Sequence, residues 1–183
     1  MTGPKITVAR KSGAAALAKR VLGITKLAAY VGIPASDSRK ADLLAMAGQT
    51  TSKKKKSKLT SAATQDINNA ELLFIFSKGS PAHNQPPRPV LEPAIEADGN
   101  KQAIANELSQ SVKASIGGDH DGAVKRMKRA GLAGQNAAKN WFTDSRNHWA
   151  PNTAGTIAAK GSDRPGIDTG AMRAAITSLT KEE

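Results

Sequence analysis

The side chains with the strongest potential for chemistry are three histidines and two aspartates. Histidine can act as a general acid or base and as a metal ligand, and aspartate offers oxygen ligands. His83, His120 and His148 are scattered along the chain, and no HExxH or comparable spacing joins any two of them. Asp119 and Asp121 flank His120 in GDHDG. A metal site needs about four or more converging ligands, and aspartates before a helix are typical caps, so we expect no metal site.

Motifs for nucleophilic catalysis and phosphate binding are also missing from the sequence. The GSP at 79–81 lacks the flanking residues of a nucleophile elbow. No glycine-rich loop precedes a lysine and a hydroxyl at the spacing of a phosphate-binding loop. The chain contains no cysteine, which excludes disulfides and thiolate metal sites. We therefore expect a protein that is not an enzyme and has no catalytic residue and no cofactor.

The hydrophobic pattern argues against membrane insertion and export. The longest apolar run, 70–76, contains Glu71 and is far shorter than the roughly 20 residues that span a bilayer. The apolar stretch 14–17 is closed by Lys19 and Arg20 too soon for the core of a signal peptide. These features predict a soluble, unexported protein, and the lack of cysteine favours a reducing compartment.

Positive charge is concentrated in the first third of the chain. The net charge is +12; residues 1–60 carry 13 lysines and arginines against Asp37 and Asp42, whereas residues 61–183 carry 14 against 13 acids. The centre of this basic third is TSKKKKSKLTS. Adjacent like charges repel, so we expect a flexible, solvated Lys-rich loop at 49–61. Such a loop also suits contact with a polyanion. The candidate contact residues are Lys53, Lys54, Lys55, Lys56 and Lys58.

Caps and periodicity predict several elements in the first half of the chain. Ser12 can cap a helix over 14–22, alternating apolar residues indicate a strand over 26–33, and a short helix follows over 38–49. A further helix over 69–79 is capped by Asn69, has Glu71 in its first turn and ends at Gly79. Its apolar run 72–76 predicts almost complete burial, and a buried strand is the alternative for the same run.

Two long helices are predicted beyond the proline-rich stretch 81–93. The first runs from about Pro93 to Ile116 and is broken by a glycine pair at 117–118. The second restarts at Asp119 or Asp121, and three glycines weaken it unless another backbone approaches closely there. The candidates for its buried side are Val124, Met127, Leu132, Ala138 and Phe142.

Structural residues crowd the last part of the chain. Thr153 can cap a helix over 154–160 that ends at Gly161. Asp168 or Thr169 can cap a helix over 170–176, where Gly170 permits close packing. From the residues alone, this segment is a stability element without a partner role. Aromatic residues make up only 3% of the chain, so its core is small and association would stabilise it.

Two ordered blocks of this sequence resemble a known family. The first is NAELLFIFSKGSPAHNQPPRPVLEPAIEA at 69–97 and the second is WAPNTAGTIAAKGSDRPGIDTGAMRAAIT at 149–177, with YVGIP at 30–34 as a shorter match. They are similar to the neck, or tail-completion, proteins of tailed bacteriophages, also described as virion morphogenesis or head-to-tail joining proteins. The matching residues are Phe76, Gly79, Pro87, Arg88, Pro89, Trp149, Pro151, Ile157, Lys160, Ile167, Asp168, Thr169, Gly170, Met172 and Arg173.

The sequence departs from the family pattern at a few positions. Ile75 and Ser77 stand where the family often has His and Glu, and Val90 stands where it has an aromatic residue. The lysine-rich stretch 49–61 has no counterpart in the pattern. These departures bear on the details of contact with partners.

The resemblance implies a single α+β domain over 1–183, with a small antiparallel sheet packed against several helices and extended loops. It implies a structural virion protein without enzymatic activity that forms a ring at the head–tail junction, with genome DNA in the lumen. The implied partners are further copies of itself, connector or head-completion proteins, and tail-terminator or tail-tube proteins, with non-specific DNA contact and no membrane. The expected location is the virion neck, and the host cytoplasm during assembly.

Two other classes stay open at this point. A basic DNA-binding accessory protein of phage assembly would explain the charge, although the sequence contains no recognisable helix-turn-helix or aromatic stacking platform. A hydrolase acting during assembly or lysis would require a polar pocket, with His83, His120 and Asp121 as its candidate residues.

Overall fold

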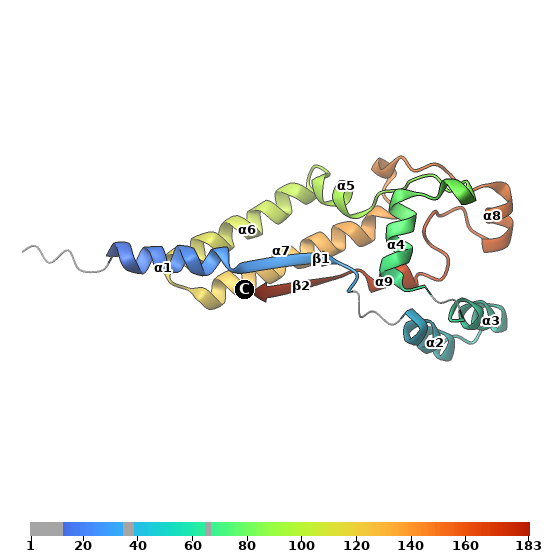
Figure 1. Cartoon of the computed structure of the whole chain (residues 1–183), viewed down its shortest axis with the longest axis horizontal. Helices are drawn as coiled ribbons and strands as arrows, with labels where there is room; N and C mark the ends of the chain where they lie inside the picture. The colour runs from blue at the N-terminus through green and yellow to red at the C-terminus, as the bar shows by residue number, and fades with distance from the viewer. Residues whose placement is uncertain (1–12, 35–38, 65–66) are drawn as a thin grey trace, which may run out of the picture.

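The chain forms an elongated molecule in which a long helical hairpin carries a small sheet (Figure 1). The computed structural model describes residues 13–34, 39–64 and 67–183. Helices α6 (Asn100–Gly117) and α7 (His120–Trp141) form the hairpin, and strands β1 (Leu27–Gly32) and β2 (Thr177–Glu182) pack on α7. Helix α1 (Gly13–Thr25) lies against α6. The α+β class, with a small antiparallel sheet against several helices, is confirmed.

The sheet joins segments from opposite ends of the described chain. The strands are antiparallel, with Leu27 opposite Glu182 and Tyr30 opposite Leu179. The strand predicted over 26–33 is confirmed as β1. The sequence pattern does not predict β2, because its TSLTKE contains one apolar residue and its pairing is entirely non-local.

Two glycines of α7 let the sheet approach the helix closely. A Cβ added at Gly131 would lie 3.3 Å from Cβ of Ser178, and one added at Gly134 would lie 3.0 Å from Cγ2 of Val31. The cost of glycine in a helix is therefore offset by close packing against both strands. On the same helix Met127 is buried as expected, whereas Leu132 is 49% exposed and was wrongly assigned to the buried side.

The predicted continuous helix from Pro93 to Ile116 is wrong, because the chain breaks it into α5 (Leu91–Glu96) and α6. Gly99 lies at a φ of 84°, which a helix interior does not allow. The Asn100 side chain donates a hydrogen bond of 2.8 Å to the carbonyl of Ala94 and fixes the break. The end of α6 at a glycine pair and the cap of α7 by Asp119, which accepts from the Gly122 N–H, are as predicted.

The predicted flexible loop at 49–61 is also wrong, because the lysines form helix α3 (Lys53–Ala62). It follows α2 (Arg39–Gln49), which lies where a short helix was predicted. Lysine is a good helix former, Ser52 caps the N-terminus, and Leu59 provides a buried anchor. Leu43, Ala47, Leu59, Ala63 and Ala171 form the cluster that attaches α2 and α3 to the rest of the molecule.

Helix α4 (Asn69–Lys78) confirms the helical alternative for its apolar run, with two corrections. The N-cap is Asn68 and not Asn69, and it forms a reciprocal capping box with Glu71. Burial is one-sided, because Phe74 is 65% exposed while Phe76 is buried. The three-to-four residue spacing of a helix places only part of such a run against the core.

The main core lies where α7 meets the head, the name we give to residues 69–96 and 142–176. The head holds α4, α5, the 3-10 turns Pro81–His83 and Ser145–Asn147, α8 (Ala154–Lys160) and α9 (Ala171–Ala175) (Figure 1). The buried residues of the main core are Leu73, Phe76, Val90, Ala94, Ala138, Trp141, Phe142, Met172 and Ile176. The initial helix α1 spans the predicted 14–22, and its predicted cap Ser12 lies outside the described residues.

Candidate partner-binding groove

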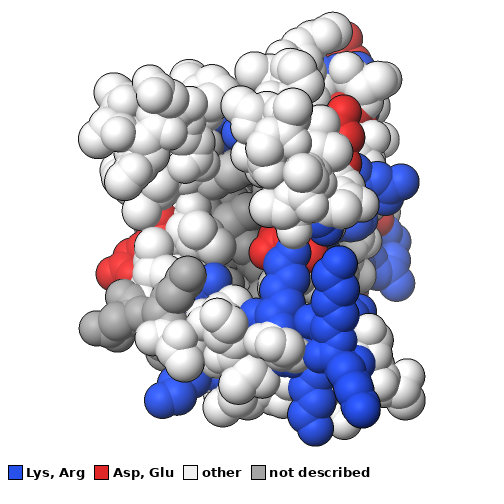
Figure 2. Space-filling model, turned by 90° about the vertical axis from the view of Figure 1, so that its right-hand side faces the viewer, with Lys and Arg blue, Asp and Glu red and all other residues white. Residues whose placement is uncertain are grey.

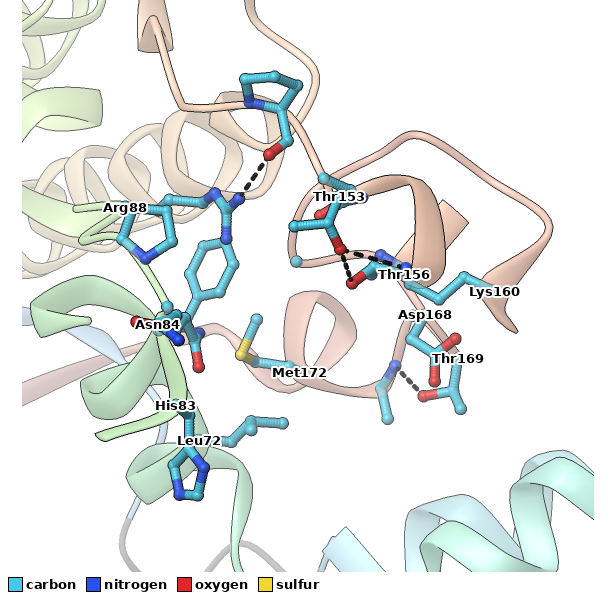
Figure 3. Close-up of a pocket in the computed structure, with 18 of the residues that line it drawn as sticks. Leu72, His83, Asn84, Arg88, Thr153, Thr156, Lys160, Asp168, Thr169 and Met172 are labelled. Atoms are coloured by element: carbon cyan, nitrogen blue, oxygen red, sulfur yellow. Dashed lines mark hydrogen bonds between the residues drawn. The ribbon is translucent and has the colours of Figure 1, made fainter. Parts of the chain in front are cut away.

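A groove of about 940 Å³ opens in the head between the two blocks of sequence that carry the resemblance (Figure 3). One wall comes from residues 72–88, the other from residues 151–172, and Arg39 of α2 also lines the groove. More than half of the family-motif residues line it. These are Phe76, Arg88, Pro151, Lys160, Asp168, Thr169, Gly170 and Met172.

A cluster of aromatic rings supports the groove. The rings of Phe76 and Trp149 meet edge to face at 5.2 Å between centroids, and those of Phe142 and Trp149 at 5.6 Å. The indole Nε1 of Trp149 donates to the Pro89 carbonyl at 3.2 Å. Trp149 thus lies outside the groove but connects the two blocks.

Arg88 forms the most direct connection between the blocks. Its Nε and Nη2 donate to the Ala150 carbonyl at 3.1 and 2.8 Å, and Nη2 also donates to the Pro151 carbonyl at 3.2 Å. The guanidinium lies 5.7 Å from the centroid of the Phe76 ring. Only 6% of the residue is exposed, and this burial lowers the pKa of Arg88 from its ordinary value.

The turn after α4 depends on a glycine. Gly79 has φ 77° and ψ 175°, a conformation that essentially only glycine adopts. A Cβ at this position would lie 2.7 Å from the carbonyl oxygen of Gln85 and 2.8 Å from the nitrogen of Pro87. Gly79 therefore permits the close return of the chain that leads through Pro87 to Arg88.

The opposite wall is built from α8 and the turn that follows it. Thr153 caps α8 as predicted, accepting from the Thr156 N–H, and Gly161 ends the helix in the left-handed region. Ile157 is half-buried, whereas Lys160 reaches the groove and donates from Nζ to the Arg164 carbonyl at 2.8 Å. Burial lowers the pKa of Lys160, and the nearby cations Lys58 and Arg88 lower it further, against the opposing influence of nearby aspartates.

The acidic residue of the Ile-Asp-Thr-Gly segment does not cap a helix as predicted. The Asp168 carboxylate forms an ion pair with Lys58 of α3, with 2.5 Å between Oδ1 and Nζ. The Thr169 hydroxyl accepts a hydrogen bond of 3.2 Å from the Ala171 N–H. Gly170 has φ 86°, and nothing lies within 4 Å of a Cβ placed there. Gly170 therefore allows a left-handed backbone conformation at this position, and it does not provide the close packing that we expected.

The remaining motif residues flank the groove. Ile167 is half-buried against the main core, and Met172 is buried beneath the groove. Arg173 follows on α9 and is half-exposed, away from the residues that line the groove. Pro87 and Pro89 are exposed on either side of Arg88.

The candidate polyanion residues lie on α3, at the same end of the molecule. Figure 2 shows lysine and arginine side chains gathered over part of this end. Lys58 forms an ion pair with Asp168. The remaining candidate residues are exposed: Lys53, Lys54, Lys55 and Lys56. The first turns of α3 therefore present a basic surface that is held by secondary structure.

Sequence reasoning named eight of the groove residues as motif residues, and those that it did not name include Arg39, Asn152 and Gly166. Arg39 carries no motif that would reveal it, because only the fold brings α2 to the groove, whereas Asn152 stands within the second block, next to Pro151. Gly166 has φ 70°, and a Cβ there would lie 2.7 Å from Cζ of Phe76. The Pro-Gly pair at 165–166 signals a turn but not its contact with the aromatic rings.

The histidines do not converge. His83 lines the groove, His120 lies 3.5 Å from Glu182 at the end of β2, and His148 occupies a left-handed position with φ 46°. Across residues 13–34, 39–64 and 67–183, no three histidine or acidic side chains form a group able to hold a metal ion. In that same part of the chain, no helix has the length and hydropathy of a bilayer span.

Comparisons with protein-family models, with curated proteins and with solved structures gave no match.

Proposed function

We propose that this chain is a structural protein of a tailed-bacteriophage virion that completes the neck at the head–tail junction. In this proposal it acts without enzymatic activity, as an oligomeric ring around the DNA channel. Its neighbours are connector or head-completion proteins on one side and tail-terminator or tail-tube proteins on the other. It assembles in the host cytoplasm and remains in the virion.

The observation that carries this proposal is the convergence of the two sequence blocks. They are separated by more than fifty residues, yet Arg88 binds the carbonyls of Ala150 and Pro151, and Trp149 packs on Phe76. Motif residues that have no catalytic chemistry thus join the two blocks into one packed unit. Such a unit at one end of an elongated molecule suits a subunit that must hold fixed contacts with its neighbours.

The exposed apolar surface supports self-association. Helix α1 has no buried residue, although it carries Leu17, Val21 and Leu22 at 43–63% exposure. On the neighbouring helix α6, Val112 and Ile116 are 40% and 43% exposed. A subunit of a ring would cover such residues against the next copy, which would add the apolar burial that a small core lacks.

Deletion of the gene from the phage genome that carries it tests the proposal. After induction, negative-stain microscopy of the lysate is expected to show DNA-filled heads beside separate or misjoined tails. Expression of the intact gene in trans should restore joined particles. Normally joined virions from the deletion strain would refute the neck function.

The alternative, a basic DNA-binding accessory protein, is favoured by one observation. The exposed lysines 53–56 lie on an ordered helix, which can follow a phosphate backbone. In this case duplex DNA binds tightly, its affinity falls steeply with salt, and deletion of the gene leaves heads and tails joined. The two experiments therefore distinguish the neck protein from the accessory protein.

A further inference from the structure

The groove contains a buried cation that no acid neutralises. Arg88 is 6% exposed, and its hydrogen bonds go to the carbonyl oxygens of Ala150 and Pro151. Within the part of the chain that the structure describes, no carboxylate forms an ion pair with it. Buried arginines are ordinarily paired, because an isolated charge is costly to remove from water. An anionic ligand would supply the missing charge.

Further donors in the groove lack acceptors. The Arg88 Nη1 donates to no described residue, since only Nε and Nη2 are engaged. The Nδ2 of Asn152, which lines the same groove, is buried and has no hydrogen-bond partner in the described structure. Buried donors are nearly always satisfied in proteins, so the Asn152 amide points to a ligand that brings an acceptor oxygen, whereas Arg88 Nη1 is not fully buried and can donate to such a ligand or to water.

The charges around the groove favour an anion as well. Arg39, Arg88 and Lys160 line it, whereas Asp168 is the sole carboxylate among the described residues that do so. Lys58 already engages that carboxylate at 2.5 Å. Figure 3 shows Arg88 and Lys160 on opposite sides of the open space, with Thr153 and Thr156 between them.

The groove also has apolar lining, which favours a peptide over a nucleic acid. Leu72 and Phe76 come from one wall and Met172 from the other, together with prolines at 81 and 86. A volume of about 940 Å³ accommodates a few residues of an extended chain. Phosphate backbones match cations but gain little from aliphatic contacts, whereas a peptide can present carboxylates and apolar side chains alternately.

We propose that the groove binds a short acidic peptide segment of a partner protein. Carboxylates of that segment meet Arg88 on one side and Lys160 on the other, backbone carbonyls accept from Asn152, and apolar side chains cover Leu72 and Met172. This inference goes beyond the neck function and does not depend on it, because the chemistry of the groove is the same for any partner.

The test measures binding of a fluorescein-labelled peptide of alternating Glu and Leu to the full chain by fluorescence anisotropy. We expect saturable binding, and much weaker binding of the matched Gln–Leu peptide. Lys160→Gln should weaken binding by about tenfold, since a charge-assisted hydrogen bond is lost from a semi-enclosed site. Thr156→Trp, at an exposed position on the rim, should block the groove.

Lys54→Gln is the matched control, because it removes the same charge from exposed α3. It should change peptide affinity by less than about twofold, as expected for an exposed charge outside the groove. The proposal is wrong if no saturable binding occurs, or if Lys54→Gln weakens binding as much as Lys160→Gln. It is equally wrong if duplex DNA displaces the peptide, which would assign the acidic ligand to the basic surface of α3.

Discussion

Arg88 is held in the interior by backbone carbonyls, and the geometry of its guanidinium matters for this role. Nε and Nη2 both donate a hydrogen bond to the Ala150 carbonyl, and the single ammonium of lysine cannot reproduce this arrangement. Arg88→Lys should therefore destabilise the fold by about 2 kcal/mol, measured by urea unfolding. Arg129→Lys, at an exposed position on α7, is the control and should change stability little. Equal stability of the two variants would mean that the hydrogen bonds of the Arg88 guanidinium contribute nothing to the free energy of unfolding.

Gly79 and Gly161 provide a matched pair for backbone strain. Both have positive φ, but Gly79 faces backbone atoms within 3 Å whereas nothing lies within 4 Å of a Cβ at Gly161. Gly79→Ala should cost about 3 kcal/mol or more, and Gly161→Ala about 1 kcal/mol. Thermal unfolding of both variants measures the difference. A Gly161→Ala variant that is the less stable of the two would contradict this account of the turn.

Asp144 anchors the turn that leads to Trp149, and it makes stability depend on pH. Hydrogen bonds from the Arg146 side chain and backbone lower the pKa of Asp144 to about 2. Because the folded pKa lies below the unfolded value, its stabilisation is present above about pH 4 and is lost as pH falls through about 2. Asp144→Asn should thus lower the melting temperature at neutral pH. The difference in melting temperature between this variant and the wild type should become smaller between about pH 4 and pH 2. Asp163→Asn, which removes an exposed acid elsewhere, should show no such narrowing.

At the scale of elements, local signals predicted the helix ends better than they predicted burial or order. The caps at Asp119 and Thr153 and the stop at Gly161 act within a few residues, so the sequence reveals them. Helix α3 was missed because its order depends on Leu59, which is buried in a cluster with residues of α2 and Ala171. A charge run alone does not reveal such an anchor.

Helix α3 carries lysines where its own dipole disfavours them. Lys53 and Lys54 lie in the first turn, next to the partial positive charge of the helix N-terminus. Replacing both with glutamate should stabilise the protein by roughly 0.5–2 kcal/mol and weaken any binding to DNA. Calorimetry and a DNA-binding titration measure the two effects. A decrease in stability would show that these lysines make contacts that favour the fold.

At the scale of the whole molecule, the groove could be predicted only in part. The two blocks contain every described groove residue except Arg39, and eight of the groove residues were named from the sequence as motif residues. Arg39 could not be predicted, since neither periodicity nor spacing places α2 beside residues 151–172. The β1–β2 pairing was missed for the same reason, because it is a long-range contact without a local signal.

The exposed apolar residues Val112 and Ile116 of α6, which we call the α6 stripe, should matter for assembly and not for folding. Val112 is 40% exposed on this stripe, so Val112→Lys should leave the melting temperature of the subunit nearly unchanged and shift the protein towards monomers. Analytical ultracentrifugation measures the shift. Gln110→Lys adds the same charge at an exposed position on another side of the helix and should leave assembly intact. If both variants assemble like the wild type, this stripe is not a subunit interface.

The most direct measurement of the central claim is electron cryo-microscopy of the head–tail junction of the tailed phage to which the proposed function assigns this protein. The proposed function predicts a ring of identical subunits between connector and tail, each fitted by the helical hairpin, the β1–β2 pair and the head described above. A neck whose density is fully accounted for by other chains, with no copy of this one, would contradict the claim.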